Sequence, residues 1–138
     1  MIKKCDVILA DDDADDRMFL VEALQDNSFS GHLCEAENGK SLLEILEYKK
    51  ANPNKILPYL IVLDLNMPLL NGFEVLKILK NDNDLNKIPV VVLTSSSRKE
   101  DENICKNAGC LRYIRKPHSI SGYSVIAKEL LSIIYSFS

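Results

Sequence analysis

Short apolar runs and longer segments with apolar residues at helical spacing alternate along the chain. The runs over residues 60–63 and 89–93 indicate strands that are buried on both faces of a parallel sheet. The expected strands cover residues 5–10, 32–36, 60–63, 89–93 and 111–115. The expected amphipathic helices cover residues 14–25, 41–50, 73–80, 100–108 and 119–135. Five strands, each followed by a helix, predict an α/β fold, a doubly wound five-stranded parallel sheet with helices on both faces.

Capping and turn-forming residues separate these segments. Asp13 is expected to cap the first helix at its N-terminus and Gly109 to close the fourth helix. The pair Asn38-Gly39 is expected to end the second strand, whose alternation of polar and apolar residues is typical of a sheet edge. We find no repeat or linker, so residues 1–138 are interpreted as a single domain.

Composition excludes several classes of protein. Seventeen Lys and Arg against twenty Asp and Glu give a formal charge of -3, so there is no basic field for nucleic acid and DNA is not an expected partner. The apolar run over residues 7–10 is too short for a signal peptide or a membrane span, and a cytoplasmic protein is expected. The four cysteines lack CxxC spacing and are expected to be reduced and mostly buried.

Polar residues follow the expected strands at the point where each one ends. Asp11 and Asp12 follow the first strand, Asp64 the third, Thr94 the fourth and Lys116 the fifth. In a parallel sheet these ends share one edge, where ligands bind. Crowded carboxylates indicate a hard cation such as Mg²⁺, and a hydroxyl with an ammonium suits an incoming phosphoryl group. Asp64, from a central strand, is the expected nucleophile.

These residues belong to an ordered set of short motifs. The set consists of Asp11-Asp12, Asp64-x-Asn66-Met67-Pro68 followed by Gly72, Thr94-Ser95 and Lys116-Pro117. In this order and spacing it resembles the receiver domain of two-component response regulators over nearly the whole chain. The resemblance implies a flavodoxin-like sheet with the strand order 2-1-3-4-5, as in the chemotaxis member of that family.

The resemblance also implies roles for the acidic residues. Asp64 would accept a phosphoryl group from a phosphohistidine of a sensor histidine kinase. Asp11, Asp12, Asp64 and the backbone carbonyl of Asn66 would bind Mg²⁺, with Asp12 as a direct ligand and Asp11 acting through water. Such a domain catalyses its own phosphorylation and dephosphorylation and is a switch, not an enzyme with a separate substrate.

Further roles implied by the resemblance concern the response to phosphorylation. Thr94 and Lys116 would hold the phosphoryl oxygens, and Thr94 and Tyr113 would move when the phosphoryl group arrives. The face formed by the helix over 100–108, the strand over 111–115 and the last helix would then change its affinity for partners. A homodimer across that face is a hypothesis.

The resemblance further implies a stand-alone, chemotaxis-regulator-like protein without an output domain. Such a protein would dock a downstream target, pass the phosphoryl group to a phosphotransfer protein, or drain phosphate from a kinase. The long connection over residues 47–58 is similar to that of stand-alone receivers that partner phytochrome-type histidine kinases.

Three residues depart from the pattern of the family. Asn71 stands where Asp more usually precedes Gly72, and little effect is expected because Asn also forms turns. His118 follows Lys116-Pro117 and is interpreted as a surface residue. Ser95 is larger than the usual Ala or Gly and is expected to slow the access of water to the phosphoryl group.

An EF-hand is one alternative for the acidic run after the first strand. Asp11, Asp13, Asp15 and Glu22 match positions 1, 3, 5 and 12 of its loop. Asp16 stands where the loop needs Gly, and the segment is better explained as a helix. We therefore expect Asp13, Asp15 and Asp16 to form a solvated first helical turn.

Three other functions use a related fold. A small-molecule phosphatase with an aspartyl phosphate would have an acid two residues after Asp64, where this chain has Asn66. A receiver-fold binding module without phosphorylation usually lacks an acid, the Thr or the Lys, all of which are present. A flavodoxin would have a loop rich in Ser, Thr and Gly in place of Asp11-Asp12.

Overall fold

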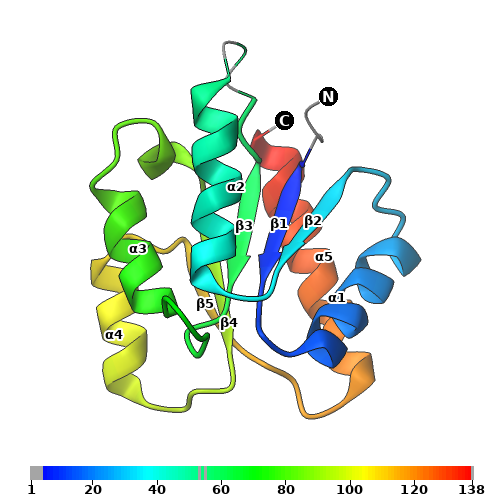
Figure 1. Cartoon of the computed structure of the whole chain (residues 1–138). Helices are drawn as coiled ribbons and strands as arrows, with labels where there is room; N and C mark the ends of the chain where they lie inside the picture. The colour runs from blue at the N-terminus through cyan, green and yellow to red at the C-terminus, as the bar shows by residue number, and fades with distance from the viewer. Residues whose placement is uncertain (1–4, 53, 55, 138) are drawn as a thin grey trace.

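The computed structural model describes residues 5–52, 54 and 56–137, and its centre is one parallel sheet (Figure 1). The strands are β1 (Val7–Ala10), β2 (Leu33–Ala36), β3 (Leu60–Leu63), β4 (Val90–Thr94) and β5 (Arg112–Arg115). They pair in the order β2-β1-β3-β4-β5, with all four pairings parallel. The predicted fold class and strand order are confirmed.

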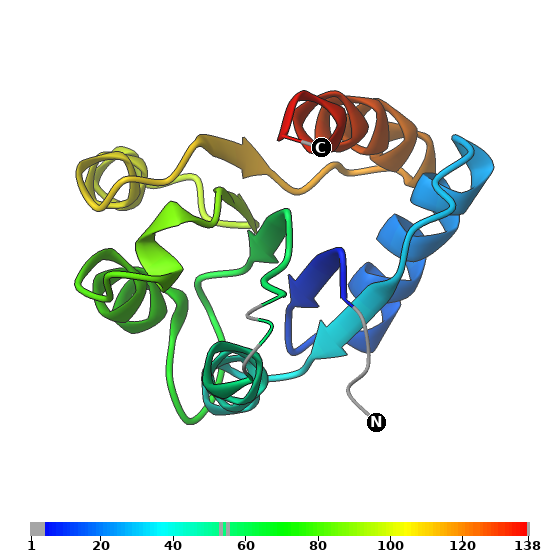
Figure 2. The same ribbon diagram turned by 90° about the horizontal axis from the view of Figure 1, so that it is seen from above.

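Helices cover both faces of this sheet. They are α1 (Ala14–Asp26), α2 (Gly39–Ala51), α3 (Gly72–Lys80), α4 (Lys99–Asn107) and α5 (Ile120–Phe137), with a short 3₁₀ helix, η1 (Leu85–Lys87), before β4. Helices α1 and α5 lie on one face, and α2, α3 and α4 lie on the other (Figures 1 and 2). None of the helices in the described ranges is long and apolar enough to cross a membrane.

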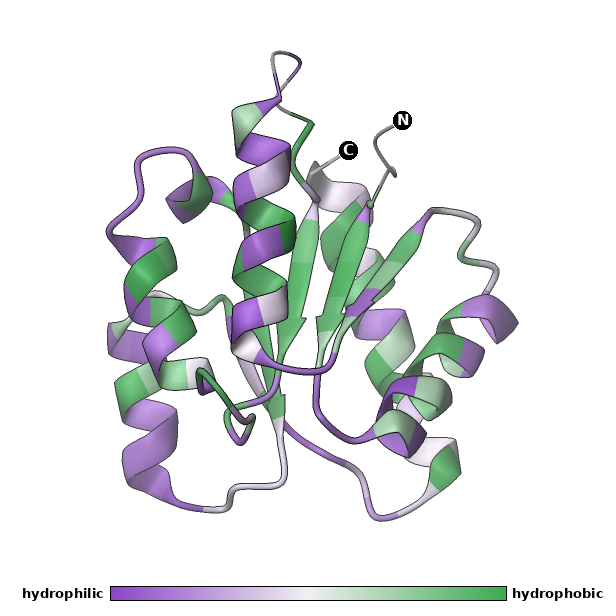
Figure 3. Cartoon of the chain, viewed as in Figure 1, coloured by the Kyte–Doolittle hydropathy of each residue, from purple (hydrophilic) through white to green (hydrophobic). Residues whose placement is uncertain are grey.

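Two hydrophobic clusters, one on each face of the sheet, fill the space between the strands and the helices. Along β1, Val7 and Leu9 face the cluster shared with α1 and α5, whereas Ile8 and Ala10 face the cluster shared with α2 and α3. Because both faces of the central strands are covered, every residue of β1, β3 and β4 is buried, which explains the continuous apolar runs. Figure 3 shows the same pattern as hydrophobic strands between helices that have one polar side.

The helix ends confirm two sequence predictions and correct a third. The Asp13 side chain caps α1 by accepting from the backbone N–H groups of residues 15 and 16. Gly109 follows the end of α4 with a φ of 92°, a conformation that favours glycine. The predicted start of the second helix at residue 41 is wrong, because α2 begins two residues earlier, at Gly39. Asn38 caps it, its side chain accepting from the N–H of Ser41 at 2.7 Å.

The expectation that all four cysteines are reduced is also wrong. Cys5, just before β1, forms a disulfide with Cys34 in β2, with 5.6 Å between their Cα atoms. Parallel pairing of β1 with β2 brings these residues together although they lie 29 positions apart. Spacing along the chain could not reveal this contact. Cys105 and Cys110 are free, as predicted, and Cys105 is buried.

The connection over residues 47–58 is shorter than predicted, because α2 continues to Ala51. The comparison of this loop with those of phytochrome-partner receivers includes residues 53 and 55, which lie outside the described residues.

Candidate functional site

The carboxyl ends of four strands bring the predicted site residues to one edge of the sheet, at the bottom of Figure 1. Asp64 follows β3, and its N–H donates to the carbonyl of Ala10, the last residue of β1, at 2.9 Å. Lys116 follows β5, and its N–H donates to the carbonyl of Thr94 at 2.8 Å. The strand pairing itself therefore places these side chains next to one another, as the sequence predicts.

Three carboxylates form the acidic centre of this edge. Oxygens of Asp11, Asp12 and Asp64 all lie within 4.8 Å of one another. Asp11 and Asp64 are buried and Asp12 is exposed. Several carboxylates with one side open to water fit the preference of Mg²⁺ for oxygen ligands and retained water. Asn66, whose backbone carbonyl is the fourth expected ligand, lies exposed in the loop after β3.

The ammonium group of Lys116 lies in the middle of these acids. Its Nζ atom is 2.9 Å from Asp64 Oδ2, 2.8 Å from Asp11 Oδ2 and 2.7 Å from Asp16 Oδ2. The Lys116 side chain is only 11% exposed, so these ion pairs are shielded from solvent.

Asp16 is a site residue that sequence reasoning missed. We expected a solvated side chain, but Asp16 contacts Lys116 and its own side chain is 25% exposed. The available signal was geometric, since helical side chains point toward the N-terminus of their helix and the N-terminus of α1 faces the strand ends. The amphipathic pattern reports only burial against the core and does not indicate this contact.

Burial and neighbouring charges act in opposite directions on the pKa values of Asp11 and Lys116. Burial is the main reason that the pKa of Asp11 rises to about 6, although the hydrogen bond with Lys116 lowers it. Burial alone would lower the pKa of Lys116, but its bonds with Asp11, Asp16 and Asp64 outweigh burial and raise that pKa. The lysine therefore stays charged, while one buried acid takes up a proton readily.

Backbone hydrogen bonds orient the two buried carboxylates. Asp64 Oδ1 accepts from the N–H of Leu65 at 2.7 Å, and Asp11 Oδ1 accepts from the N–H of Asp13 at 2.9 Å. Gly72, the first residue of α3, packs so closely that a Cβ atom there would lie 2.4 Å from the Asp64 carbonyl oxygen. Any larger residue at position 72 would push α3 away from the backbone of Asp64.

The two predicted switch residues lie on β4 and β5. Thr94 is fully buried, and its Oγ1 accepts from the N–H of Ser96 at 3.3 Å. Tyr113 is half-buried and packs against the cluster on the α2, α3 and α4 face. Its hydroxyl oxygen is buried, and burial raises the pKa of this phenol. In this structure the hydroxyl end of Tyr113 is therefore turned inward.

The three residues that depart from the expected pattern lie near the edge. Asn71 and Glu74 form a capping box at the start of α3, in which each side chain accepts from the backbone N–H of the other residue. His118 is exposed, as predicted, and so is Ser95.

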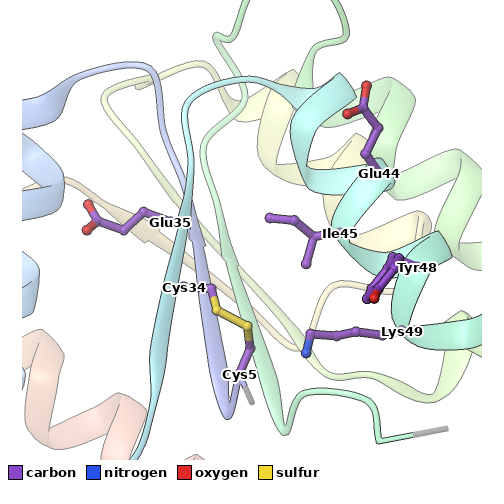
Figure 4. Close-up of a pocket in the computed structure, with 7 residues that line it drawn as sticks. All are labelled: Cys5, Cys34, Glu35, Glu44, Ile45, Tyr48 and Lys49. Atoms are coloured by element: carbon purple, nitrogen blue, oxygen red, sulfur yellow. A yellow bond between two sulfur atoms is a disulfide. The ribbon is translucent and has the colours of Figure 1, made fainter. Parts of the chain in front are cut away.

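A cavity elsewhere in the molecule does not change the assignment of the functional site to the ends of the strands. It has a volume of about 390 Å³ and lies between α2 and β2, beside the disulfide and the side chains of Tyr48 and Lys49 (Figure 4). Its two acids, Glu35 and Glu44, are exposed. In the described part of the chain, the carboxylates able to hold a metal ion gather only at the strand ends.

Comparisons with known proteins agree with this geometry. The sequence model of a family described as "Response regulator receiver domain" matches residues 7–123. The phosphorylated cyanobacterial phytochrome response regulator RcpA superposes with a TM-score of 0.86 over 99% of this chain and 97% of its own, at 29% identity. The Mn(2+)-bound form of response regulator Rcp1 gives 0.80 over 92% of each chain, at 30% identity.

A curated relative shares more sequence over a shorter segment. It is the polar-differentiation response regulator DivK of Brucella anthropi, which is 39% identical over 74 residues. That segment is 54% of this chain and spans 60% of the length of DivK.

Proposed function

This chain belongs to the response regulator receiver domain family, and on that premise we propose that it is a switch phosphorylated on Asp64 by a histidine kinase in a Mg²⁺-dependent reaction. Receiver domains are signalling switches, and the family implies a histidine kinase as partner. The observation that carries the proposal is the position of Asp64, a buried carboxylate within reach of two further acids and 2.9 Å from an ammonium group.

Asp64 supplies the nucleophile in this reaction. One of its oxygens forms a bond to phosphorus while the P–N bond of the phosphohistidine breaks. The imidazole leaves with the electron pair of that bond and regains a proton from solvent. The ammonium group of Lys116 binds the phosphoryl oxygens and stabilises their negative charge during the transfer. The product is an acyl phosphate on Asp64.

The donor atoms at the ends of the strands fit the ligand preferences of Mg²⁺. Asp11, Asp12 and Asp64 would hold Mg²⁺ together with the carbonyl of Asn66. When bound, Mg²⁺ neutralises the negative charge that otherwise repels an incoming phosphoryl group. The structure of the relative Rcp1 was obtained with Mn(2+), an ion with similar ligand preferences.

The output of the switch is a change in protein contacts. After phosphorylation, Thr94 would move toward the phosphoryl group, and the side chain of Tyr113 would change its position. Exposed apolar side chains on the adjoining face support a protein partner there, among them Ile104 on α4, Leu111 before β5 and Val125 on α5. A downstream target, a phosphotransfer protein or a second copy of this chain would dock on this face.

One relative supports the kinase class, and the family supports the location. RcpA is described as a cyanobacterial phytochrome response regulator, so a phytochrome-type histidine kinase is the proposed phosphodonor. We place the protein in the cytoplasm on the basis of its family.

The test is intact-protein mass spectrometry after incubation with acetyl phosphate. With Mg²⁺ the protein should gain one phosphoryl group that hydroxylamine removes, whereas EDTA should prevent the gain. Asp64→Asn should remain unlabelled while keeping the fold, because the amide has nearly the same shape but is a poor nucleophile. Labelling of Asp64→Asn to the extent of the wild type would contradict the proposal.

A further inference from the structure

Asp16 contacts the functional lysine, although it belongs to none of the motifs of the site. Its Oδ2 lies 2.7 Å from Lys116 Nζ, at least as close as either acid at the strand ends. Asp16 also lines a small cavity of about 10 Å³ together with Asp11 and Asp64. Such a cavity has room for roughly one water molecule, so Asp16 is part of the same compact arrangement.

Three neighbours fix the position of Asp16. Its backbone N–H donates to the Asp13 side chain at 3.1 Å. The next residue, Arg17, donates to the Asp11 carbonyl and, at 3.0 Å, to Glu35 on β2. On the other side lies Tyr123 of α5, whose pKa is raised to about 12 by burial and by the charge of Asp16. The backbone around Asp16 is therefore fixed by the Asp13 cap and by the bonds of Arg17, and Tyr123 of α5 lies near the carboxylate of Asp16.

The ammonium group of Lys116 has three N–H bonds and three carboxylate neighbours. Two of these carboxylates, Asp11 and Asp64, are also among the expected ligands of Mg²⁺. A dication bound to them withdraws the negative charge that stabilises the lysine. Without another partner, an ammonium group that is largely shielded from water would lie beside a dication, which is strongly unfavourable.

We propose that Asp16 is a positioning residue that keeps the Lys116 ammonium at the site when Mg²⁺ binds to Asp11 and Asp64. This inference rests on the metal site of the proposed function. In the metal-free protein the three acids share the lysine. In the metal-bound protein Asp16 becomes its principal partner, and Lys116 remains available to the phosphoryl oxygens.

The neighbouring residue Asp15 provides a matched control. It has the same side chain, lies in the same first turn of α1 and is exposed. Asp15→Asn and Asp16→Asn remove the same charge from the same first turn of α1. A difference between them therefore reports the contact with Lys116 and not the net charge.

The test is NMR of the lysine side-chain ammonium groups, which become visible when ion pairs slow their proton exchange. Lys116→Arg identifies the signal of Lys116. Wild type and Asp15→Asn should show it both without and with saturating Mg²⁺. Asp16→Asn should show it only without Mg²⁺, because Asp11 and Asp64 still hold the lysine there. Asp16→Glu, which restores the charge, should recover the signal with Mg²⁺.

Amide spectra of the same samples establish folding and Mg²⁺ binding. A Lys116 signal that survives Mg²⁺ in Asp16→Asn would overturn the proposal, as would one that Mg²⁺ removes from the wild type. The proposal would also be overturned if the amide spectrum of the wild type did not change when Mg²⁺ is added. Phosphorylation is not needed for this readout. A protein that behaves as proposed here but takes no label from acetyl phosphate would contradict the phosphorylation proposal alone.

Discussion

The two ends of the central strands are built in opposite ways. At the start of β1, the disulfide between Cys5 and Cys34 joins two neighbouring strands and is itself buried. At the end of the same strand, Asp11 lies beside Asp64, and one ammonium group, that of Lys116, compensates both. Five residues, four of which form β1, separate a covalent crosslink from a cluster of buried like charges.

One end of the strands therefore contributes to stability, and the other end provides the functional groups. A disulfide stabilises the fold by restricting the unfolded chain. Buried carboxylates cost stability because burial disfavours their charged form. The acidic end of the strands is therefore arranged for a cation and a phosphoryl group, and the opposite end holds the strands together. Substitutions at the two ends should have different consequences.

The largest effect on stability is expected from Lys116→Ala, which removes the compensating charge. Without metal, the free energy of unfolding should fall by about 3 kcal/mol, because buried carboxylates lose their partner. Mg²⁺ should bind as well as in wild type or more tightly, since a competing cation is gone, and should restore stability. Urea unfolding with and without Mg²⁺ measures both. A variant equally unstable with saturating Mg²⁺ would show that the lysine has a purely structural role.

The same variant tests the switch. Lys116→Ala should still accept a phosphoryl group on Asp64 but should fail to transmit its presence to the α4, β5 and α5 face. Amide chemical shifts of Tyr113 and its neighbours, compared before and after phosphorylation, measure this response. Shifts equal to those of the wild type would contradict the proposed role of Lys116.

Removal of the disulfide should weaken the opposite end alone. The double variant Cys5→Ala with Cys34→Ala should lower the free energy of unfolding by about 2 to 3 kcal/mol. Mg²⁺ affinity should not change. Alkylation of the unfolded wild type should modify two cysteines without reductant and four with it. Four reactive cysteines without reductant would contradict the crosslink, and weaker Mg²⁺ binding in the variant would contradict the separation of the two ends.

The pKa of Asp11 predicts a smaller effect that depends on pH. Its folded-state pKa of about 6 lies above the usual value of 3.8, so the folded protein retains a proton that the unfolded chain has lost. The stabilisation from this group is complete below pH 3.8 and is lost as the pH rises through 6. The metal-free protein should thus lose about 2 kcal/mol from this group between pH 4 and pH 7.

Asp11→Asn is the control for this pH dependence. It should remove the Asp11 component from the pH profile and stabilise the metal-free protein at pH 7, while weakening Mg²⁺ binding. Mg²⁺ affinity of the wild type should fall below pH 6, because protons compete with the metal for Asp11. Thermal unfolding and metal titrations across this pH range test both statements. Identical profiles for wild type and variant would refute the assignment to Asp11.

The smallest effect is expected in the loop between β3 and α3. Leu69 has a φ of 67°, a left-handed conformation that costs energy for a bulky residue, and its side chain is 75% exposed. Leu69→Asn should raise the free energy of unfolding by about 0.5 to 1 kcal/mol, because Asn tolerates this conformation. Urea unfolding detects the change. A loss of stability would mean that the Leu69 side chain contributes more than its backbone costs.

Much of the fold could be predicted because its signals are local. Strands buried on both faces need continuous apolar runs, and their carboxyl ends necessarily meet at one edge of a parallel sheet. Asp11, Asp64, Thr94 and Lys116 could therefore be brought together from sequence alone. The caps at Asp13 and Gly109 were equally local, because each depends on the few residues around it.

The features that were missed depend on how elements pack. The contact of Asp16 with Lys116 depends on the angle between α1 and the sheet, which the amphipathic pattern does not define. The disulfide depends on the register of β1 and β2. The early start of α2 reflects a competition at Asn38, which could end a strand or cap a helix, and the cap prevailed.

The most direct test of phosphorylation on Asp64 locates the phosphoryl group itself. Borohydride reduction of the protein phosphorylated with acetyl phosphate and Mg²⁺ converts an aspartyl phosphate into homoserine, and peptide sequencing by mass spectrometry then finds the reduced residue. Homoserine is expected at position 64 alone. Reduction at Asp11, Asp12 or Asp16, or a phosphoryl group on serine or threonine, would contradict it.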